Sequence, residues 1–386
     1  MEKFIKFFLK KKFLSFRQYF FPKFRVFSDF FKVLRIENKD IFFGYYDLNP
    51  FSLNSDLILC HSVKKNSKYA EIVVFNLNET KKNEIFDKTN AWSWQLGARL
   101  RWLNNSRSIG FNFLEKDKGS FKIINIKSRK EKIIKFPIFD INEKKMLGLS
   151  INFSVLEKFR PGYGFFHKEK ENNIKLISLK NSSIKLKIEA KQLLNCLKIN
   201  NVKCFYFNHL QFSKCGYFFS FFFIYKIDKN FKSTLFVYDS KKKKIFPITT
   251  SIEVPSHYFW LSSNKIIITI VKDKIVNYYE YDLKKKRKYI LSYFPTNNDG
   301  HPSVNPKNKN LIVTDTYPDR LGNQTLLVIN KKKKQYKSIA YFFNPENYYG
   351  KNKCDLHPRW STCGKKICCD TAFNDKREMF IIDTNC

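Results

Sequence analysis

The stretch His357-Pro-Arg-Trp-Ser-Thr-Cys-Gly364 has three counterparts elsewhere in the chain. They are His209-Leu-Gln-Phe-Ser-Lys-Cys-Gly216, His257-Tyr-Phe-Trp-Leu-Ser-Ser-Asn264 and His301-Pro-Ser-Val-Asn-Pro-Lys-Asn308. Each begins with a histidine and precedes a short apolar run, and the histidines are 48, 44 and 56 residues apart. A repeat with this period indicates one structural unit used several times. It predicts that the four histidines occupy the same position in successive units.

The units are built from short strands. From about residue 41 onward, apolar runs alternate with turns, which is typical of antiparallel sheets. A second phrase closes each unit, as in Leu235-Phe-Val-Tyr-Asp239 and Met379-Phe-Ile-Ile-Asp383. Four strands in about 45 residues form one blade of a β-propeller. Two earlier units fit at 46–76 and 95–126, and a poorer one at about 135–205 is expected to begin with Ile151-Asn-Phe-Ser154.

We therefore predict an all-β fold, a β-propeller of seven four-stranded antiparallel blades over residues 41–386. Six blades with a long insertion near 140–200 is the alternative. Residues 1–40 form a distinct segment with eleven Phe and eleven Lys or Arg and no Gly. Its first part can form a helix with one aromatic and one basic face. Residues 33–36 are predicted to be a strand that completes the blade ending at Asp383.

The formal net charge of the 386 residues is +38, which raises the question of a nucleic-acid partner. The lysine runs at 241–244, 284–286 and 331–334 follow predicted strands, so we interpret them as solvated hairpin tips. No nucleic-acid-binding module is recognisable, and we expect no nucleic-acid partner. The basic, aromatic segment 1–40 can instead lie on an anionic membrane surface or pack on the main domain.

Nine cysteines, an odd number, lack zinc-site spacing, and no secretory cleavage pattern is visible. These features favour a reducing cytoplasm. No apolar stretch approaches the roughly 20 residues that span a bilayer. We expect a cytoplasmic monomer, with a peripheral position at the inner membrane as an extension of the membrane hypothesis.

The four repeat histidines are the candidate metal site. If His209, His257, His301 and His357 begin equivalent inner strands, their side chains converge at one end of the propeller. Neutral imidazoles gathered in this way suit a divalent transition metal such as manganese or zinc. The alternative for each histidine is a structural role within its own blade.

Four further residues are predicted to support this site. Asp47 and Gln95 occupy the equivalent places in the first two blades, while Asp299 and Asp355 each precede a repeat histidine by two positions. Carboxylates beside metal-binding imidazoles can fix the ring tautomer. The alternative is that these residues hydrogen-bond backbone groups in turns.

Three residues are candidates for the chemistry itself. Arg160 and Tyr163 lie in Phe159-Arg-Pro-Gly-Tyr-Gly164, where Arg160 can pair with a carboxylate and Tyr163 can transfer a proton. Arg320 ends a segment that also contains two carboxylates. The alternative for both segments is an ordinary loop. The sequence contains no Gly-rich phosphate loop and no Ser-His-Asp motif in a recognisable context.

The repeat resembles the propellers of the TolB type and of the oligogalacturonate lyase type, in which an aromatic-Ser-Pro-Asp-Gly-Lys phrase marks the turn between the first two strands. Degraded forms occur here at Phe212-Ser-Lys-Cys-Gly216 and Trp360-Ser-Thr-Cys-Gly-Lys365. The resemblance is good over about 205–386 and loose over 41–130. The chain is also similar to a group of uncharacterised bacterial propeller proteins with phrases such as Gly44-Tyr-Tyr-Asp47.

The resemblance to the lyases implies a metal-assisted β-elimination on a uronate-containing, acidic saccharide. The family uses three His and a Gln, whereas four His are available here and Gln95 lies in a distant blade. Arg160, Arg320 and Tyr163 would supply the base or surround the metal. The sequence leaves a second class of function open, a non-catalytic propeller scaffold at the inner membrane surface associated with polysaccharide biosynthesis.

Overall fold

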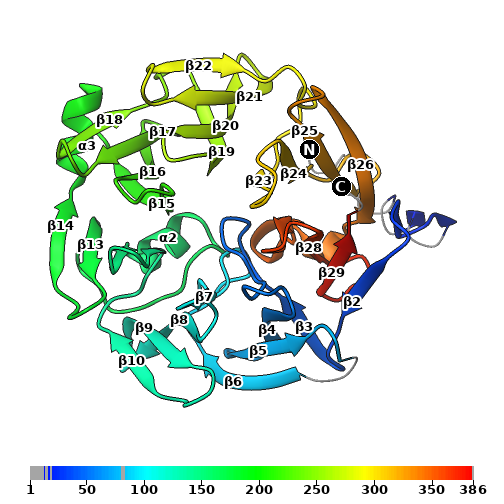
Figure 1. Ribbon diagram of the computed structural model, residues 1–386. Coiled ribbons are helices and arrows are strands. Elements are labelled where there is room, and N and C mark those ends of the chain that lie inside the picture. Colours follow the sequence, from blue (N-terminus) through cyan, green and yellow to red (C-terminus); the bar gives the residue numbers. More distant parts are fainter. Residues whose placement is uncertain (1–12, 14–15, 18–19, 80–82, 385–386) are drawn as a thin grey trace. The chain divides into compact units, whose positions relative to one another are not determined.

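The computed structural model describes residues 13, 16–17, 20–79 and 83–384. The strands of this part of the chain form seven antiparallel sheets, and each sheet has at least four strands. The protein is therefore an all-β, seven-bladed β-propeller (Figure 1), which confirms the prediction of seven blades rather than six. The chain divides into two compact units, Met1–Lys88 with Tyr293–Cys386, and Thr89–Ser292.

The first unit holds three blades. Their strands, in the order in which they are paired, are β3 (Lys39–Phe42), β4 (Leu57–Lys64), β5 (Ala70–Asn76) and β6 (Asn83–Thr89); β23 (Ser303–Val304), β24 (Leu311–Asp315), β25 (Asn323–Asn330), β26 (Gln335–Phe343) and β1 (Phe24–Val26); and β27 (Arg359–Trp360), β28 (Lys366–Thr371), β29 (Glu378–Asp383) and β2 (Phe31–Leu34). Two 3-10 turns, η1 (Glu346–Tyr348) and η2 (Gly350–Asn352), lie between β26 and β27.

The second unit holds four blades. Their strands are β7 (Arg101–Leu103), β8 (Ser108–Glu115), β9 (Lys118–Asn125) and β10 (Glu131–Ile134); β11 (Asp140–Asn142), β12 (Leu147–Ser150), β13 (Ile174–Ser178) and β14 (Ile184–Ile188); β15 (Cys204–Phe212), β16 (Phe218–Ile227), β17 (Asn230–Asp239) and β18 (Lys244–Pro247); and β19 (Val254–Trp260), β20 (Lys265–Lys272), β21 (Ile275–Asp282) and β22 (Arg287–Ile290). Two helices, α2 (Phe153–Phe159) and α3 (Ala190–Leu197), lie in or after the second of these blades.

The middle strands of each blade are buried on both faces, which explains their continuous apolar runs. All five residues of β24 are buried, and so are seven consecutive residues of β16. Between the blades of β23–β26 and β27–β29, Phe342, Trp360 and Phe380 belong to one apolar cluster. Stacked sheets that share such a core hold their first strands in fixed positions.

The N-terminal segment supplies strands to two blades. β1 pairs with β26, and β2 pairs with β29 in the register Phe31↔Ile382 to Leu34↔Met379 (Figure 1). The predicted strand that completes the last blade is thus confirmed, two residues earlier than expected. Residues 13, 16, 17 and 20 are helical, and residues 1–12, for which a helix was also predicted, lie outside the described residues.

The predicted start of the third blade is wrong. Ile151-Asn-Phe-Ser154 leads into helix α2, and the first strand of that blade is β11. The side chain of Asn152 accepts a hydrogen bond from the Val155 backbone N–H at 3.1 Å, so Asn152 caps the helix. A polar residue followed by Phe-Ser therefore marks a helix start here rather than an inner strand.

No helix within the described ranges is both long enough and apolar enough to cross a membrane. The eight described cysteines are all free thiols.

Candidate metal centre

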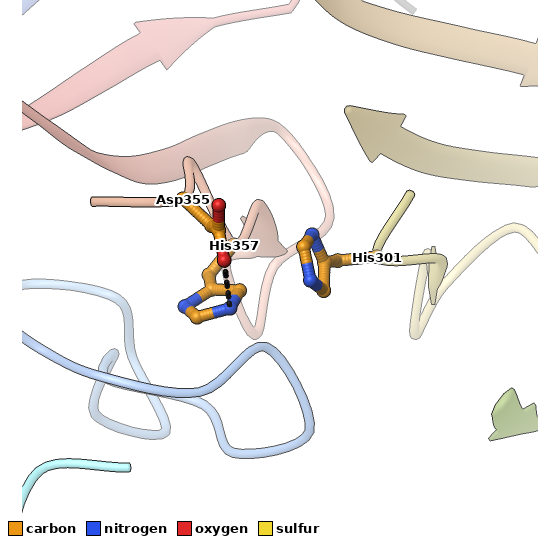
Figure 2. Close-up of side chains that lie close together, drawn as sticks. All are labelled: His301, Asp355 and His357. Carbon is orange, nitrogen blue, oxygen red and sulfur yellow. Dashed lines mark ion pairs between the residues drawn. The ribbon is translucent and has the colours of Figure 1, made fainter. Parts of the chain in front are cut away.

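Two of the repeat histidines and one carboxylate meet in the first unit. His301 lies just before β23, while Asp355 and His357 lie just before β27. One ligand atom from each of the three residues lies within 4.8 Å of the others, and all three side chains are buried. Figure 2 shows the ring of His301 approaching the His357–Asp355 pair from a neighbouring segment. We call these three residues the His–Asp cluster.

The His301 ring is held by Asp315, the last residue of β24. His301 Nδ1 lies 2.8 Å and 3.0 Å from the two Asp315 carboxylate oxygens, and the His301 backbone N–H donates to Asp315 Oδ1 at 2.7 Å. Because a carboxylate only accepts, Nδ1 carries the proton in this contact. The lone pair of the neutral ring is then on Nε2, the atom that a metal would bind.

The His357 ring is oriented in the same sense. Its Nδ1 donates to the Gly44 carbonyl at 2.9 Å, and its backbone N–H donates to Asp315 Oδ2 at 3.2 Å. His357 Nε2 lies 3.9 Å from Asp355 Oδ2. Asp315 therefore binds the backbone of both histidines, and both rings present Nε2.

A buried ion pair fixes the Gly44 carbonyl. Arg359 Nη2 donates to this carbonyl and to Asp370 Oδ2, the latter at 2.9 Å. The Asp370 carboxylate also accepts from the backbone N–H groups of Phe43 and Gly44 at 3.1 and 3.0 Å. Arg359 and Asp370 are 1% and 3% exposed, so both charges depend on this network.

Aromatic rings surround the His–Asp cluster. The Tyr45 ring centroid lies 4.8 Å from that of His357, and the Tyr46 centroid lies 5.1 Å from that of His301. The ammonium of Lys353 lies 2.6 Å from Asp355 Oδ2 and 5.1 Å from the Tyr317 ring centroid. The two imidazoles and the carboxylate of the cluster therefore lie next to the Lys353 ammonium and to three tyrosine rings, those of Tyr45, Tyr46 and Tyr317.

This donor set fits a divalent transition metal. Two imidazole nitrogens and one carboxylate oxygen are the ligands that zinc and manganese share in proteins. Ligands about 2.1 Å from one ion lie up to about 4.2 Å apart. The present separations, within 4.8 Å, need only a small contraction. Asp355, predicted to support the site, offers one of the three potential ligand atoms.

The other two repeat histidines lie in the second unit, each at an irregularity of its strand. His209 has a φ of 52° in β15, where the register with β16 shifts between Asn208 and Gln211. The register of β19 shifts in the same way around His257. The sequence repeat therefore corresponds to a repeated bulge, which re-aims the side chain.

His209 and His257 have well-defined neighbours. The His209 ring stacks on the Tyr258 ring at a centroid distance of 4.2 Å, and the Tyr258 hydroxyl donates to the His209 carbonyl. The His257 backbone N–H donates to Thr269 Oγ1 at 2.9 Å, and its Nδ1 lies 3.1 Å from Ser256 Oγ. Their membership of a four-histidine metal site stays a prediction.

The remaining supporting residues lie in turns or loops. Asp299 accepts a hydrogen bond from the Gly300 backbone N–H at 2.9 Å, and Asp47 lies in a turn just after Tyr46. Gln95 is 1% exposed, and its backbone N–H donates to the Gly162 carbonyl at 3.1 Å. Gln95 therefore lies beside the loop that contains Arg160 and Tyr163.

Two of the three predicted catalytic residues form a pair. Arg160 caps the C-terminus of α2, its guanidinium lies 4.4 Å from the Tyr163 ring centroid, and its Nη2 donates to the Tyr163 hydroxyl at 3.2 Å. Burial raises the pKa of the adjacent Tyr206, although the nearby Arg160 guanidinium acts in the opposite direction. Arg320 is exposed in the loop between β24 and β25.

Sequence reasoning missed the role of Asp315. It lies 14 residues from His301 and 42 residues from His357, and no local spacing connects it to either. The one available signal was its position as a carboxylate shortly after the apolar run Leu311-Ile-Val313.

Comparison with solved structures agrees with this architecture. No protein-family model matches the chain, and the search of curated proteins likewise gives no match. Among solved structures, an oligogalacturonate lyase in complex with manganese is 11% identical, covers 94% of this chain and 98% of its own, and superposes with a TM-score of 0.67. The oligogalacturonate lyase of Vibrio parahaemolyticus is 10% identical, with the same coverage and a TM-score of 0.63.

A third similar structure is the β-propeller domain of the Trilobed protease from Pyrococcus furiosus. It is 12% identical, covers 90% of this chain and 96% of its own, and has a TM-score of 0.56. At these identities the likeness shows the fold alone. The protein is thus a seven-bladed propeller with the architecture of the oligogalacturonate lyases, which confirms the predicted resemblance at the level of fold.

Proposed function

We propose that this protein is a metal-dependent, saccharide-active propeller and that it catalyses β-elimination on a uronate-containing glycan. The observation that carries the proposal is the His–Asp cluster, with its three ligand atoms within 4.8 Å. The fold similarity to an oligogalacturonate lyase that binds manganese supports manganese as the first candidate ion.

The residues have defined roles in this proposal. His301 and His357 present Nε2, Asp355 presents a carboxylate oxygen, and Asp315 holds both histidines in position. When bound, the cation would withdraw charge from the substrate carboxylate and so acidify the adjacent carbon-bound proton. A base removes that proton, the neighbouring C–O bond breaks, a C=C bond forms, and the leaving oxygen takes up a proton.

The base is proposed among the predicted residues. Tyr163 and Arg160 form a hydrogen-bonded pair, and Arg320 is the exposed alternative. Replacing Tyr163 by Phe removes the hydroxyl and keeps the ring. If Tyr163 is the base, kcat falls while the bound metal is unchanged.

Metal content tests the proposal first. We expect one manganese or zinc ion per chain after equilibration with either metal, and loss of that ion in the His301→Ala, His357→Ala variant, measured by elemental analysis. His167→Gln is the matched control, because His167 is a partly buried histidine of the second unit that binds the Phe153 backbone N–H. Equal metal content in all three proteins would contradict the proposal.

Activity is measured separately, with oligogalacturonate and other uronate oligosaccharides. The product of β-elimination contains a C=C bond conjugated to the carboxylate, which absorbs ultraviolet light. We expect this signal with the metal-loaded protein and its loss in Asp355→Asn. A protein that binds metal but gives no unsaturated product with any uronate would retain the metal site and exclude the lyase.

A further inference from the structure

Phenylalanine side chains of the N-terminal segment remain exposed in the folded protein. Six phenylalanines of the described chain are more than half exposed, and five of them lie between residues 16 and 30. Their exposed fractions are 61% for Phe16, 66% for Phe20, 58% for Phe21, 52% for Phe27 and 66% for Phe30. We call these five residues the aromatic ledge. Apolar surface concentrated in one segment is typical of an interaction site.

The backbone between Lys23 and Phe30, which carries the later part of the aromatic ledge, is held by hydrogen bonds to the blades. The Phe27 N–H donates to the Ile339 carbonyl at 2.9 Å, the Phe343 N–H donates to the Lys23 carbonyl at 2.7 Å, and the Asp383 N–H donates to the Phe30 carbonyl at 3.0 Å. Because these hydrogen bonds already order residues 23–30, binding a partner there costs little additional conformational entropy.

The core does not use the ledge residues. The ring of Phe24 fills the inward position, with centroid distances of 4.8 Å to Phe373 and 5.5 Å to Phe380. The Phe31 ring, although 45% exposed, also stacks on Phe380 at 5.7 Å. The inward and outward sets are therefore separate, and changing the outward set leaves the apolar cluster of the blade intact.

Basic residues lie among the exposed rings. Residues 16–32 include four basic residues and one acidic residue, Asp29. Arg25 is exposed and Lys23 is partly exposed, whereas Arg17 is buried and the Lys32 ammonium donates to the Leu77 carbonyl. The Arg25 guanidinium lies 5.0 Å from the Phe27 ring centroid, so cation and ring are next to each other. Exposed aromatic rings beside Lys and Arg fit the interface of an anionic bilayer, where the rings enter the acyl boundary and the cations meet phosphate groups.

We propose that the aromatic ledge docks this protein onto the surface of an anionic lipid bilayer. This inference is independent of the proposed lyase activity, because no ledge residue belongs to the His–Asp cluster. Docking of this kind is a monotopic, peripheral association. The cations attract the lipid headgroups, and the phenyl rings insert into the acyl boundary.

Vesicle sedimentation with the full-length chain tests the proposal. We expect binding to vesicles of phosphatidylcholine with phosphatidylserine, and at least about tenfold weaker binding for the Phe20→Ser, Phe27→Ser, Phe30→Ser variant, which loses three interfacial rings. The charge is unchanged in this variant, so the net charge of +38 cannot account for the difference.

A matched variant controls for exposed apolar surface in general. Tyr69, Phe166 and Ile252 are 54%, 69% and 65% exposed and lie outside the N-terminal segment. Replacing these three by Ser should leave vesicle binding as in the unchanged protein. Thermal unfolding of all three proteins should agree, because none of the six positions is buried.

Three results would overturn the proposal. The first is equal vesicle binding by the ledge variant and the unchanged protein, which would indicate adsorption by net charge alone. The second is an equal loss of binding in both triple variants. The third is a dimer in the absence of lipid that the ledge substitutions dissociate, which would assign the surface to a second copy of the chain.

Discussion

At the scale of single residues, the orientation of the His357 ring in the candidate site depends on a buried ion pair between Arg359 and Asp370. Arg359 and Asp370 fix the Gly44 carbonyl, and that carbonyl fixes the tautomer of His357. The histidines themselves could be predicted from the sequence, because the repeat returns them to one register. The role of Asp315 could not be predicted from the sequence, because its simultaneous contact with His301 and His357 arises only when two blades pack side by side.

The Arg359→Leu substitution tests this dependence. It would leave Asp370 as an uncompensated buried carboxylate, so we expect the free energy of unfolding to fall by about 3–5 kcal/mol. Lys366→Gln is the control, since Lys366 and Asp383 form a half-exposed ion pair with side chains 34% and 38% exposed. Its cost should stay below about 1 kcal/mol in the same denaturant titration. Similar losses in both variants would contradict the role given to Arg359.

Lys353 is expected to compete with a metal for Asp355. Its ammonium lies 2.6 Å from Asp355 Oδ2, so a bound cation must displace it or share the carboxylate with it. Lys353→Gln removes the competing charge at similar length. We expect the Kd for manganese to fall several-fold in isothermal titration calorimetry. An unchanged or weaker affinity would show that Lys353 assists the site instead.

His61 gives the protein a pH-dependent stability. This buried ring stacks on Phe42 at a centroid distance of 5.0 Å, and burial lowers its pKa from 6.5 to about 4. Since the folded pKa lies below the unfolded one, the folded state disfavours protonation. The stability contributed by this group is complete above pH 6.5 and is lost as the pH falls toward 4.

We expect the unchanged protein to lose about 2 kcal/mol more than a His61→Gln variant between pH 7 and pH 5. The measured quantity is the change in unfolding free energy between the two pH values, so the direct cost of the substitution cancels. Parallel pH profiles for the two proteins would exclude this assignment.

At the scale of elements, the Ser-x-Cys-Gly turn defines the start of a blade. In the last blade, Ser361 Oγ accepts from the Lys366 backbone N–H at 3.0 Å, and Gly364 has a φ of 75°. Asn305 of the preceding blade donates to the Gly364 carbonyl at 2.8 Å. The turn therefore joins two sheets as well as two strands, which is why the repeat phrase marked the start of this last blade in the sequence.

Gly364→Ala should cost more than the same change at Gly350. A Cβ at Gly364 would lie 2.5 Å from Asn305 Oδ1, whereas a Cβ at Gly350 would meet nothing within 4 Å. Both residues have a positive φ, so the backbone strain of about 1 kcal/mol is common to the two variants. The difference in unfolding free energy measures the crowding. Equal costs would show that the turn is not constrained by Asn305.

The same repeat failed in the third blade for a physical reason. There the polar-Phe-Ser phrase precedes a helix start, because an Asn side chain caps a helix as readily as it closes a turn. Helix α2 and the loop after it separate β12 from β13, and this insertion hides the blade's periodicity. Blade count could be inferred from length and period, but the position of the inner strand could not.

At the scale of the whole molecule, the net charge of +38 is a source of repulsion. Screening by salt reduces it, because the Debye length shortens from about 30 Å at 0.01 M to about 8 Å at 0.15 M ionic strength. We expect the midpoint of thermal unfolding to rise over this range. A falling midpoint would show that attractive ion pairs outweigh the repulsion.

The completion of the last blade by β2 has a consequence for synthesis on the ribosome. Leu34 of β2 pairs with Met379, so this early strand stays without its partner strand until almost the entire chain has been made. At roughly 5–20 residues per second this delay is on the order of 20–70 seconds. During this delay, Phe24 and Phe31 cannot yet pack against Phe380 of β29. In a newly made chain, the leading end therefore presents unpaired strand and phenyl surface until the trailing end is made.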